Sequence, residues 1–332
     1  MEQKTAAIQD AELKARAGSL HNLVHARWAA STTKKYSAAW NKWETWCDKH
    51  PESPKRPADR FYIALYINDL VIEGGSYGAL EAASAGIRWG HITTGLPNPM
   101  EDLFLKTILE GAKRTIGKPK GSGQKKPMSV EMVKQVVSRY GCGKNLLHHR
   151  LVVICVLGLS GFLRISELLA IQIRHLVFKD THMEITIPKA KNDQLRQGHV
   201  VHIARTGSPY CAVYWLQKYI NETGLAKEED NFVISRLNRT RKGHNAHGDK
   251  PLSDGTVREI FMQEIEPICQ EIEPGSYCLH SLRSGGASSA VNNGVSERLI
   301  GKHGRWKSGF SRDRYIKDNK KQRLSVTKAL GL

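Results

Sequence analysis

The sequence has few acidic residues. Aspartate and glutamate together number 32 against 50 lysines and arginines, so the formal net charge is +18 and the isoelectric point lies near 9.7. This balance indicates a polyanionic partner, and nucleic acid is the first candidate. A basic ribosomal protein or a membrane-surface protein has a similar charge, so only the motifs below separate these classes.

Paired cysteines, internal repeats and long apolar segments are also missing. The six cysteines have no paired spacing, and no signal peptide opens the chain. These absences predict a reduced intracellular compartment, either the cytoplasm of a bacterium or the nucleus of a eukaryotic host. The longest apolar run, residues 151–163, contains two glycines and is shorter than the about 20 residues of a membrane span. We therefore expect a buried helix here and no membrane partner.

Residues 1–117 have the pattern of an all-helical domain. A chain of 332 residues is long enough for two domains of about 150 residues each. Ser31-Thr32-Thr33 offers an N-cap to a helix with one clear apolar face. That face is spaced by four, three and four residues and consists of Tyr36, Trp40, Trp43 and Cys47. Further helices are expected at residues 1–30, 58–73, 79–94 and 101–116.

The composition of residues 118–127 predicts a basic linker between the two domains. The segment contains glycine, proline and lysine and has no acidic residue. A linker of this composition is flexible and suited to follow phosphates. Its lysines are Lys118, Lys120, Lys125 and Lys126.

Residues 128–332 predict helices around a small β-sheet. Residues 184–188 are typical of a strand that leads into a turn, and residues 200–203 of the return strand. The expected helices are one that Ser129 caps, the apolar helix that ends at Arg164, one at residues 209–223, and one that begins at Ser253 or Asp254 and carries Val257, Ile260, Phe261 and Ile265. The predicted fold class is therefore mainly α with a small β-sheet.

A basic, glycine- and asparagine-rich segment at residues 236–250 is expected to be a solvated loop. It contains His244 and His247, whose spacing suggests zinc at first sight. No cysteine or acidic pair at metal spacing accompanies them, so we expect no metal site.

Tyr315 lies in a strongly basic segment. Residues 298–323 contain ten lysines or arginines and only two acidic residues. A phenol, with a pKa of about 10, is a poor nucleophile at neutral pH unless nearby cations stabilise the phenolate or a base takes the proton. The same cations would hold a phosphodiester for attack. His280 and Arg283 are three residues apart, so on a helix they share one face and reach one phosphate together.

These residues resemble the tyrosine recombinase (phage-integrase) family. The resemblance covers residues 126–332 and rests on an ordered series of motifs: Arg164-x-x-Glu167 after an apolar helix, Lys191 in the turn after a strand, His280-x-x-Arg283, Trp306 and Tyr315. Trp306 precedes Tyr315 by nine residues, the family interval, and resembles the Cre-like branch. His303, which lies twelve residues before Tyr315, is the alternative candidate for the position of Trp306. Lys189 is the alternative candidate for the position of Lys191.

The resemblance implies a role for each motif residue. Arg164 and Arg283 would neutralise the phosphate, while Trp306 would donate its indole N–H to it. His280 would orient the phosphate and help accept the proton of Tyr315, and Lys191 would protonate the leaving 5′ oxygen. Glu167 would order Arg164 or form a plain helix salt bridge with it. Neither a metal nor a cofactor is implied.

The resemblance also implies how DNA is held. Residues 1–117 would be a core-binding (SAM-like) domain that forms a C-shaped clamp on duplex DNA with the catalytic domain, residues 128–332. The residues expected to touch DNA, besides the linker lysines, are Lys34, Lys35, Lys42, Arg88, Thr256 and Arg258. For Arg88 the sequence favours the alternative of a plain exposed arginine without a partner. The partner would be double-stranded DNA with paired recombination sites. The C-terminal helix either joins a homotetramer or folds back on its own domain.

Three other functions compete with recombination. A type IB topoisomerase shares the chemistry but relaxes supercoils as a monomer, and Trp306 with the small helical first domain argues against it. A protein derived from a mobile element could bind DNA without cutting it, yet every expected site residue is present. A noncatalytic basic scaffold does not need the spaced arginines, histidine, tryptophan and tyrosine.

Overall fold

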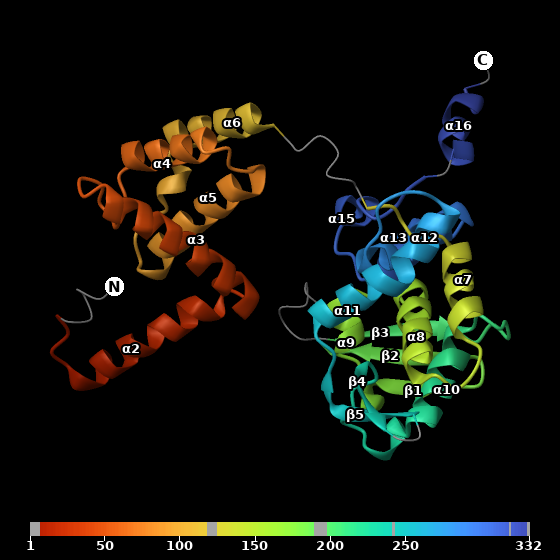
Figure 1. The fold of residues 1–332 in the computed structure, drawn as a ribbon. Helices are drawn as coiled ribbons and strands as arrows, with labels where there is room; N and C mark the ends of the chain where they lie inside the picture. The colour runs from red at the N-terminus through yellow and green to blue at the C-terminus, as the bar shows by residue number, and fades with distance from the viewer. Residues whose placement is uncertain (1–6, 118–124, 189–197, 241–242, 319, 331–332) are drawn as a thin grey trace. The chain divides into compact units, whose positions relative to one another are not determined.

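The chain folds into two compact units, Met1–Ser122 and Gly123–Leu332 (Figure 1). The computed structural model describes residues 7–117, 125–188, 198–240, 243–318 and 320–330. Lys118, Lys120, Lys189 and Lys191 lie outside these ranges. The predicted fold class, mainly α with a small β-sheet, is confirmed. Across the described ranges, no helix is both long and apolar enough to cross a membrane.

Unit 1 is helical throughout its described part. Its elements are α2 (Ala11–Ala26), α3 (Ala30–Lys49), α4 (Arg60–Ile72), α5 (Tyr77–Thr93), the short 3-10 helix η1 (Pro99–Glu101) and α6 (Leu103–Ile116). Trp40, Trp43 and Cys47 on α3 are buried as predicted, whereas Tyr36 is only half-buried. The predicted cap at Ser31–Thr33 is wrong. The N–H groups of Thr32 and Thr33 already bond to the carbonyl of Ala29, so these residues belong to the first helical turn.

Unit 2 places its helices around one central buried helix. The helices are α7 (Val130–Tyr140), α8 (Leu146–Ser160), α9 (Ile165–Leu169), η2 (Ile173–His175), α10 (Ala212–Thr223), η3 (Leu225–Lys227), α11 (Asp254–Ile260), a π-helical turn (Phe261–Ile265), α12 (Glu266–Ile272), α13 (Leu279–Asn292), α14 (Glu297–Gly304), α15 (Gly309–Asp313) and α16 (Lys320–Lys328). The apolar run on α8 is buried, as predicted. Ser129 and Ser253 cap α7 and α11.

The apolar helix ends earlier than predicted. α8 stops at Ser160, and Gly161 and Phe162 form a turn in which Phe162 has a φ of 45°. A positive φ is incompatible with a continued right-handed helix. Arg164 therefore does not end the apolar helix but occupies the position before the first residue of α9. This turn directs the Arg164 side chain and the Phe162 carbonyl to the same region.

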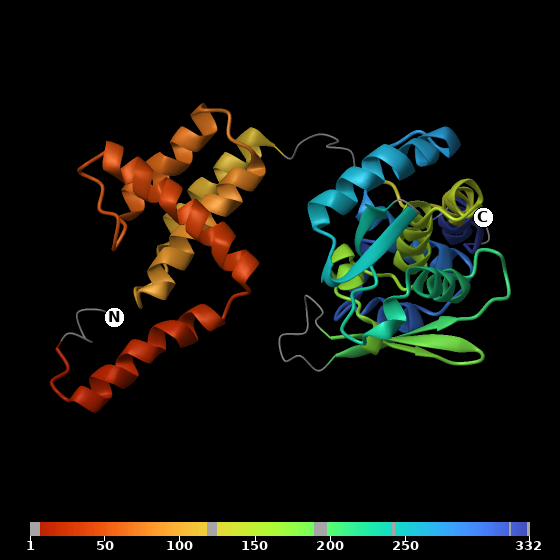
Figure 2. The ribbon, with the colours of Figure 1, turned by 60° about the horizontal axis from the view of Figure 1, so that its bottom comes forward.

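Two small antiparallel sheets complete unit 2. Strands β1 (Leu176–Phe178), β2 (His182–Ile187) and β3 (His199–Ala204) pair in that order, and Figure 2 shows these green strands at the lower edge of the unit. Alternate residues of β2, such as Met183 and Ile185, are buried and face the core, while Glu184 opposite His202 faces outward. The two strands predicted at this hairpin are confirmed.

The second sheet corrects an expectation. Residues 236–250 were predicted to be a loop, but residues 236–240 and 243–250 belong to two paired strands, β4 (Ser235–Thr240) and β5 (Gly243–Pro251). Leu237 and Ala246, which pair across the strands, give this sheet too few apolar residues for a hydrophobic alternation that would reveal it in the sequence. His244 and His247 are three residues apart on β5, and side chains at an odd separation in a strand point to opposite faces.

Candidate active site and basic groove

Glu167 is the centre of a buried ion cluster. Its side chain is 1% exposed. Its Oε1 accepts a hydrogen bond from Nη1 of Arg164 at 2.5 Å, and its Oε2 accepts one from Nη2 of Arg305 at 2.7 Å. Nη1 of Arg283 lies 3.9 Å from Oε2. One carboxylate therefore faces three guanidinium groups, all of them buried.

The cluster keeps an excess of positive charge. Burial acts to raise the pKa of Glu167, but Arg305, the backbone N–H of Arg164 and the guanidiniums of Arg164 and Arg283 outweigh it, so the pKa is lowered and the carboxylate stays ionised. Burial, together with repulsion from Arg164 and Arg305, lowers the pKa of Arg283. An arginine keeps its charge at neutral pH. One negative and three positive groups leave a net charge of about +2, which a bound anion would compensate.

Arg283 is held by main-chain carbonyls. It lies on α13 with no exposed surface, and its Nη1 and Nη2 donate to the carbonyls of Phe162 and Gly304, the latter at 2.5 Å. Gly285 and Gly286 follow it on α13, and a Cβ on Gly286 would lie 2.2 Å from the carbonyl oxygen of Leu159. Only glycine permits this close approach of α13 to α8. The close approach brings Arg283 to the turn at Phe162.

Two aromatic rings cover this arginine. The guanidinium carbon of Arg283 lies 4.4 Å from the ring centroid of Trp306 and 5.2 Å from that of Tyr315, within the range of cation–π contacts. The two rings are themselves 5.3 Å apart. The indole Nε1 of Trp306 is buried and has no hydrogen-bond partner in the described part of the chain, and the same holds for Nε of Arg283. Buried N–H groups are rarely left unpaired, so these two indicate a ligand with acceptor atoms.

Tyr315 is positioned by its backbone. It follows α15, where its N–H donates to the carbonyl of Arg312 at 2.8 Å. Its carbonyl accepts from the hydroxyl of Ser288 on α13 at 3.3 Å, and the same hydroxyl accepts from the N–H of Lys317 at 2.9 Å. His280, exposed on the first turn of α13, lies 6.1 Å from the Tyr315 ring, centroid to centroid. The structure therefore brings His280, Arg283, Trp306 and Tyr315 together beside Arg164 and Glu167.

His303 occupies a different place from Trp306. Its Nε2 donates to the carbonyl of Ser160 at 2.8 Å, and its ring meets that of Phe162 edge-on at 4.7 Å. Burial lowers its pKa, which keeps the imidazole neutral. Trp306 contacts the Tyr315 ring directly. This geometry favours Trp306, as the spacing does.

Arg305 was not expected from the sequence. Its Nη1 and Nη2 donate to the carbonyls of Gly161, Phe162 and His303 at 2.8–3.2 Å, in addition to the bond to Glu167. Its φ of 58° is left-handed, which costs a residue with a Cβ about 1–2 kcal/mol. In the sequence it is one of ten basic residues between 298 and 323, and only its position directly before Trp306 distinguishes it.

The other predicted residues have mixed outcomes. Lys191 and Lys189 lie outside the described residues, although β2 and β3 on either side of them are described. The Nζ of Lys126 pairs with Glu273 at 2.7 Å and donates to the carbonyl of Pro274, while the side chain remains partly exposed. Lys125 donates to the hydroxyl of Ser276. The linker lysines were expected to follow phosphates, and for Lys125 and Lys126 this stays a prediction.

Thr256 and Arg258 are exposed on α11. The hydroxyl of Thr256 lies 2.9 Å from that of the capping Ser253. Nε of Arg258 donates to Asp254 at 2.7 Å, one helical turn earlier. Both side chains are thus presented to solvent at the start of one helix.

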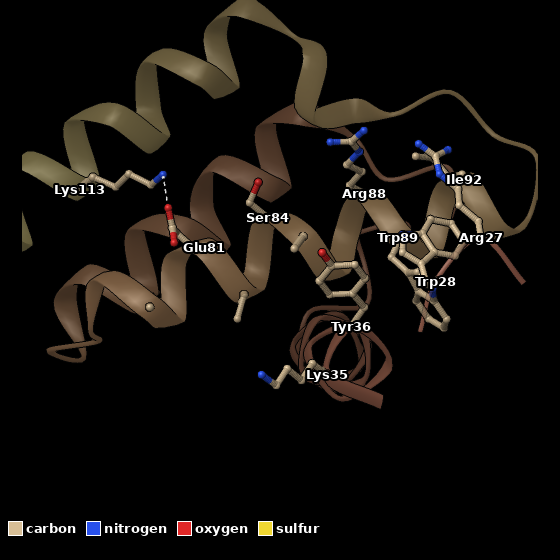
Figure 3. Close-up of a pocket in the computed structure, with 13 residues that line it drawn as sticks. Arg27, Trp28, Lys35, Tyr36, Glu81, Ser84, Arg88, Trp89, Ile92 and Lys113 are labelled. Atoms are coloured by element: carbon tan, nitrogen blue, oxygen red, sulfur yellow. Dashed lines mark hydrogen bonds and ion pairs between the residues drawn. The ribbon is translucent and has the colours of Figure 1, made fainter. Parts of the chain in front are cut away.

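Unit 1 has a basic groove of about 740 Å³ between α3 and α5 (Figure 3). Its cationic lining residues are Arg27, Lys35, Arg88 and Lys113, and its aromatic ones are Trp28, Tyr36 and Trp89. Lys113 pairs with Glu81, the acidic residue of the lining, at 3.2 Å. Lys34 and Lys42 are exposed on α3 outside this lining. Arg27 and Trp28 were missed in the sequence because they precede the helix with the clear apolar stripe.

Comparison with known proteins adds family evidence. The model of the phage integrase family matches residues 125–322. An integrase/recombinase XerD homologue of Selenomonas ruminantium is 28% identical over 310 residues, which is 89% of this chain and 86% of the relative.

Solved structures share the fold. One is the integrase of transposon Tn1549 in complex with transposon right-end DNA, at 11% identity and a TM-score of 0.57 over 95% of this chain and 99% of that chain. Another is a lambda integrase dimer bound to a core site, at 16% identity and a TM-score of 0.52 over 92% and 95% of the two chains.

We expect Glu167→Gln to lower the free energy of unfolding of unit 2 by about 3–5 kcal/mol, because it leaves three buried arginines without their counter-charge. Denaturant-dependent hydrogen exchange of unit 2 amides measures the change. The lowered pKa of Glu167 also predicts a pH dependence. The contribution of the Glu167 carboxylate to the free energy of unfolding is complete above its ordinary pKa of 4.5 and is lost as the pH falls through its lower folded-state pKa. Glu167→Gln has no carboxylate at this position and should lack this pH-dependent contribution.

The matched control for this variant is Glu297→Gln. Glu297 pairs with Arg312 at the same 2.7 Å that separates Glu167 from Arg305, but its side chain is 74% exposed. Exposed ion pairs contribute little to the free energy of unfolding, so Glu297→Gln should change it far less than Glu167→Gln does. Equal effects of the two substitutions would show that the Glu167 cluster is not a buried charge centre.

Proposed function

Because the chain belongs to the phage integrase family, we propose that it is a site-specific tyrosine recombinase that cuts and rejoins DNA through Tyr315. The observation that carries this proposal is the position of the Tyr315 ring over the buried guanidinium of Arg283, in a cluster with a net positive charge. A phosphodiester is the anion that such a site, with unpaired N–H groups, is suited to bind.

The proposed reaction begins with attack of the Tyr315 oxygen on the phosphorus. A bond forms between this oxygen and phosphorus, and the bond from phosphorus to the 5′ oxygen breaks. The phenolic proton leaves with help from His280, and the 5′ oxygen takes a proton from Lys191, with Lys189 as the reserve donor. The products are a 3′-phosphotyrosyl enzyme and a free 5′ hydroxyl. The 5′ hydroxyl of another strand reverses the step, so no external energy is needed.

Arg164, Arg283 and Trp306 stabilise the charge that builds on the nonbridging oxygens. Arg164 contributes the nitrogen atoms that Glu167 does not engage. The Nε of Arg283 and the indole N–H of Trp306 are unpaired but buried, so a small side-chain movement has to expose them before they donate to an oxygen. Donors aimed at the developing charge are typical of sites that stabilise a transition state.

Glu167 and Arg305 position these groups and do not touch the DNA. Glu167 fixes Arg164 and Arg305, and Arg305 ties Trp306 to the turn at Phe162 through main-chain carbonyls. A buried ion pair holds side chains in one geometry only when its hydrogen bonds are complete. Here the carbonyls of Gly161, Phe162 and His303 and the carboxylate of Glu167 accept from both terminal nitrogens of Arg305, while its Nε has no partner among the described residues.

Residues 1–117 are proposed to bind duplex DNA as the core-binding domain and to form, with residues 128–332, a clamp around it. The basic groove supports this assignment, because Arg27, Lys35 and Arg88 line one surface. Lys34 and Lys42 add exposed charge on α3, and Thr256 and Arg258 do so on α11 of unit 2. Contacts of this kind position a protein on the phosphate backbone.

Two paired DNA sites need more than one protomer, and we assign the contact between protomers to α16. Leu324 and Leu330 at this end of the chain are 45% and 64% exposed. A cavity of about 450 Å³ in unit 2, lined partly by Val200, Val295 and Leu299, offers an apolar surface for such a helix. Together they support a homotetramer on DNA.

Substituting Tyr315→Phe tests the chemistry. The wild-type protein, incubated with nicked duplexes that carry its site and then denatured, should form a covalent adduct at a 3′ phosphate. The affinity of the variant for the same duplex should lie within about twofold of the wild-type affinity. The variant should form no adduct, because only the nucleophilic oxygen is removed. Tyr214→Phe is the matched control, since Tyr214 is an exposed tyrosine of the same unit. An adduct that survives in the Tyr315 variant, or that maps to another residue, contradicts the proposal.

Salt dependence tests the groove. Replacing Lys35 with alanine should reduce the slope of log K against log salt by about 1, because one phosphate contact is lost. Lys49→Ala changes the same residue type at the far end of α3, outside the groove lining, and should leave the slope unchanged. Fluorescence anisotropy with a labelled duplex at several salt concentrations gives both slopes. Equal slopes for the wild type, Lys35→Ala and Lys49→Ala would show that Lys35 and its groove do not contact DNA.

A further inference from the structure

The outer face of the β2–β3 hairpin carries two histidines and a glutamate. Glu184 on β2 lies directly opposite His202 on β3, and His182 precedes Glu184 by two residues on the same strand. Alternate residues of a strand share a face, so all three side chains point away from the core. All three side chains reach solvent, with exposed fractions of 32%, 31% and 62% for His182, Glu184 and His202.

The ligand atoms of these side chains already converge. Oε1 of Glu184 lies 3.3 Å from Nε2 of His182 and 3.8 Å from Nε2 of His202, and the three atoms lie within 4.8 Å of one another. A tetrahedral ion with bonds of about 2.0–2.2 Å places its ligand atoms about 3.3–3.6 Å apart. Small side-chain rotations therefore suffice to bind one ion.

We propose that His182, Glu184 and His202 form a binding site for a borderline divalent metal ion such as Zn²⁺. Two imidazoles and a carboxylate are a donor set that zinc accepts, with water in the fourth position. Hard ions such as Mg²⁺ prefer oxygen ligands only, so they should not bind here. The site is separate from the proposed chemistry at Tyr315 and does not depend on it.

A contact behind the ligands supports this assignment. Nδ1 of His182 lies 2.9 Å from the hydroxyl oxygen of Thr181. Without a metal, Nε2 of a neutral His182 donates to the carboxylate of Glu184 and Nδ1 accepts from this hydroxyl. When a metal binds Nε2, the proton moves to Nδ1, which then donates to the Thr181 oxygen, an arrangement typical of metal-bound histidines. Sequence spacing does not reveal the cluster, because His202 is eighteen residues from Glu184 and only the strand register joins them.

The site links the two strands that flank residues 188–198. An ion bound by His182 and Glu184 from β2 and by His202 from β3 cross-links the hairpin on its outer face. Binding to the folded state alone raises the apparent stability. Occupancy should therefore raise the melting temperature and slow hydrogen exchange of the backbone amides in β2 and β3.

The test uses the full chain without a histidine tag, freed of metal with a chelator and titrated with ZnCl₂ in an isothermal calorimeter. Six free cysteines are present, so a parallel titration with Co²⁺ identifies the donor atoms by their absorption. We expect one strong site per chain, a tetrahedral cobalt spectrum without a thiolate charge-transfer band, and no binding of Mg²⁺. Glu184→Gln, which keeps the side-chain shape, should weaken Zn²⁺ binding at least about tenfold.

Two further variants make the result decisive. His202→Ala alters an exposed side chain and does not disturb the core, so it replaces Glu184→Gln in the test if that variant does not fold. It should weaken Zn²⁺ binding as much as Glu184→Gln does. His199→Ala changes a histidine of the same strand at an odd distance from His202, hence outside the cluster, and should leave binding intact. Absence of zinc binding to the wild type, or equal binding by wild type, Glu184→Gln and His202→Ala, overturns the proposal.

Discussion

A single buried carboxylate holds the site of this protein together. Glu167 lies between the guanidiniums of Arg164 and Arg305, with Arg283 close by, and all four side chains are buried. Three cations cannot share a buried space without a counter-charge. Glu167 supplies one charge, and the remaining excess is available for a phosphate. The same ion cluster thus stabilises the fold and leaves the site ready for its substrate.

The arrangement depends on close backbone contacts as much as on charge. The turn at Phe162 ends α8 early and points carbonyls at Arg283 and Arg305. Gly286 lets α13 approach that turn, and Gly285 lets it approach the main chain of Met128. The strained φ of Arg305 persists because Glu167 and three carbonyls hold its side chain, and local strain at functional sites is usually maintained in this way. Segments more than a hundred residues apart in sequence meet here.

The sequence predicted the fold class, most helices and the hairpin of β2 and β3, because hydrophobic periodicity and caps are local signals. Through the resemblance of its ordered motifs to the tyrosine recombinase family, it also predicted the residues that meet around Tyr315 in the described part of the chain. It missed Arg305, whose partners are main-chain carbonyls and a carboxylate 138 residues away. It also missed the polar hairpin of β4 and β5 and the His182–Glu184–His202 cluster. Strand register and helix packing create these features, and neither leaves a periodic pattern.

A double-mutant cycle between Glu167→Gln and Arg305→Met tests most directly whether the buried cluster acts as one unit. The free energy of unfolding is measured by denaturant titration for the wild type, both single variants and the double variant. Buried, hydrogen-bonded charges should be coupled, so the sum of the single effects should exceed the double-variant effect by about 2–3 kcal/mol. Additivity within about 0.5 kcal/mol would mean that the two side chains act independently, and Glu167 would then not be the residue on which the site depends.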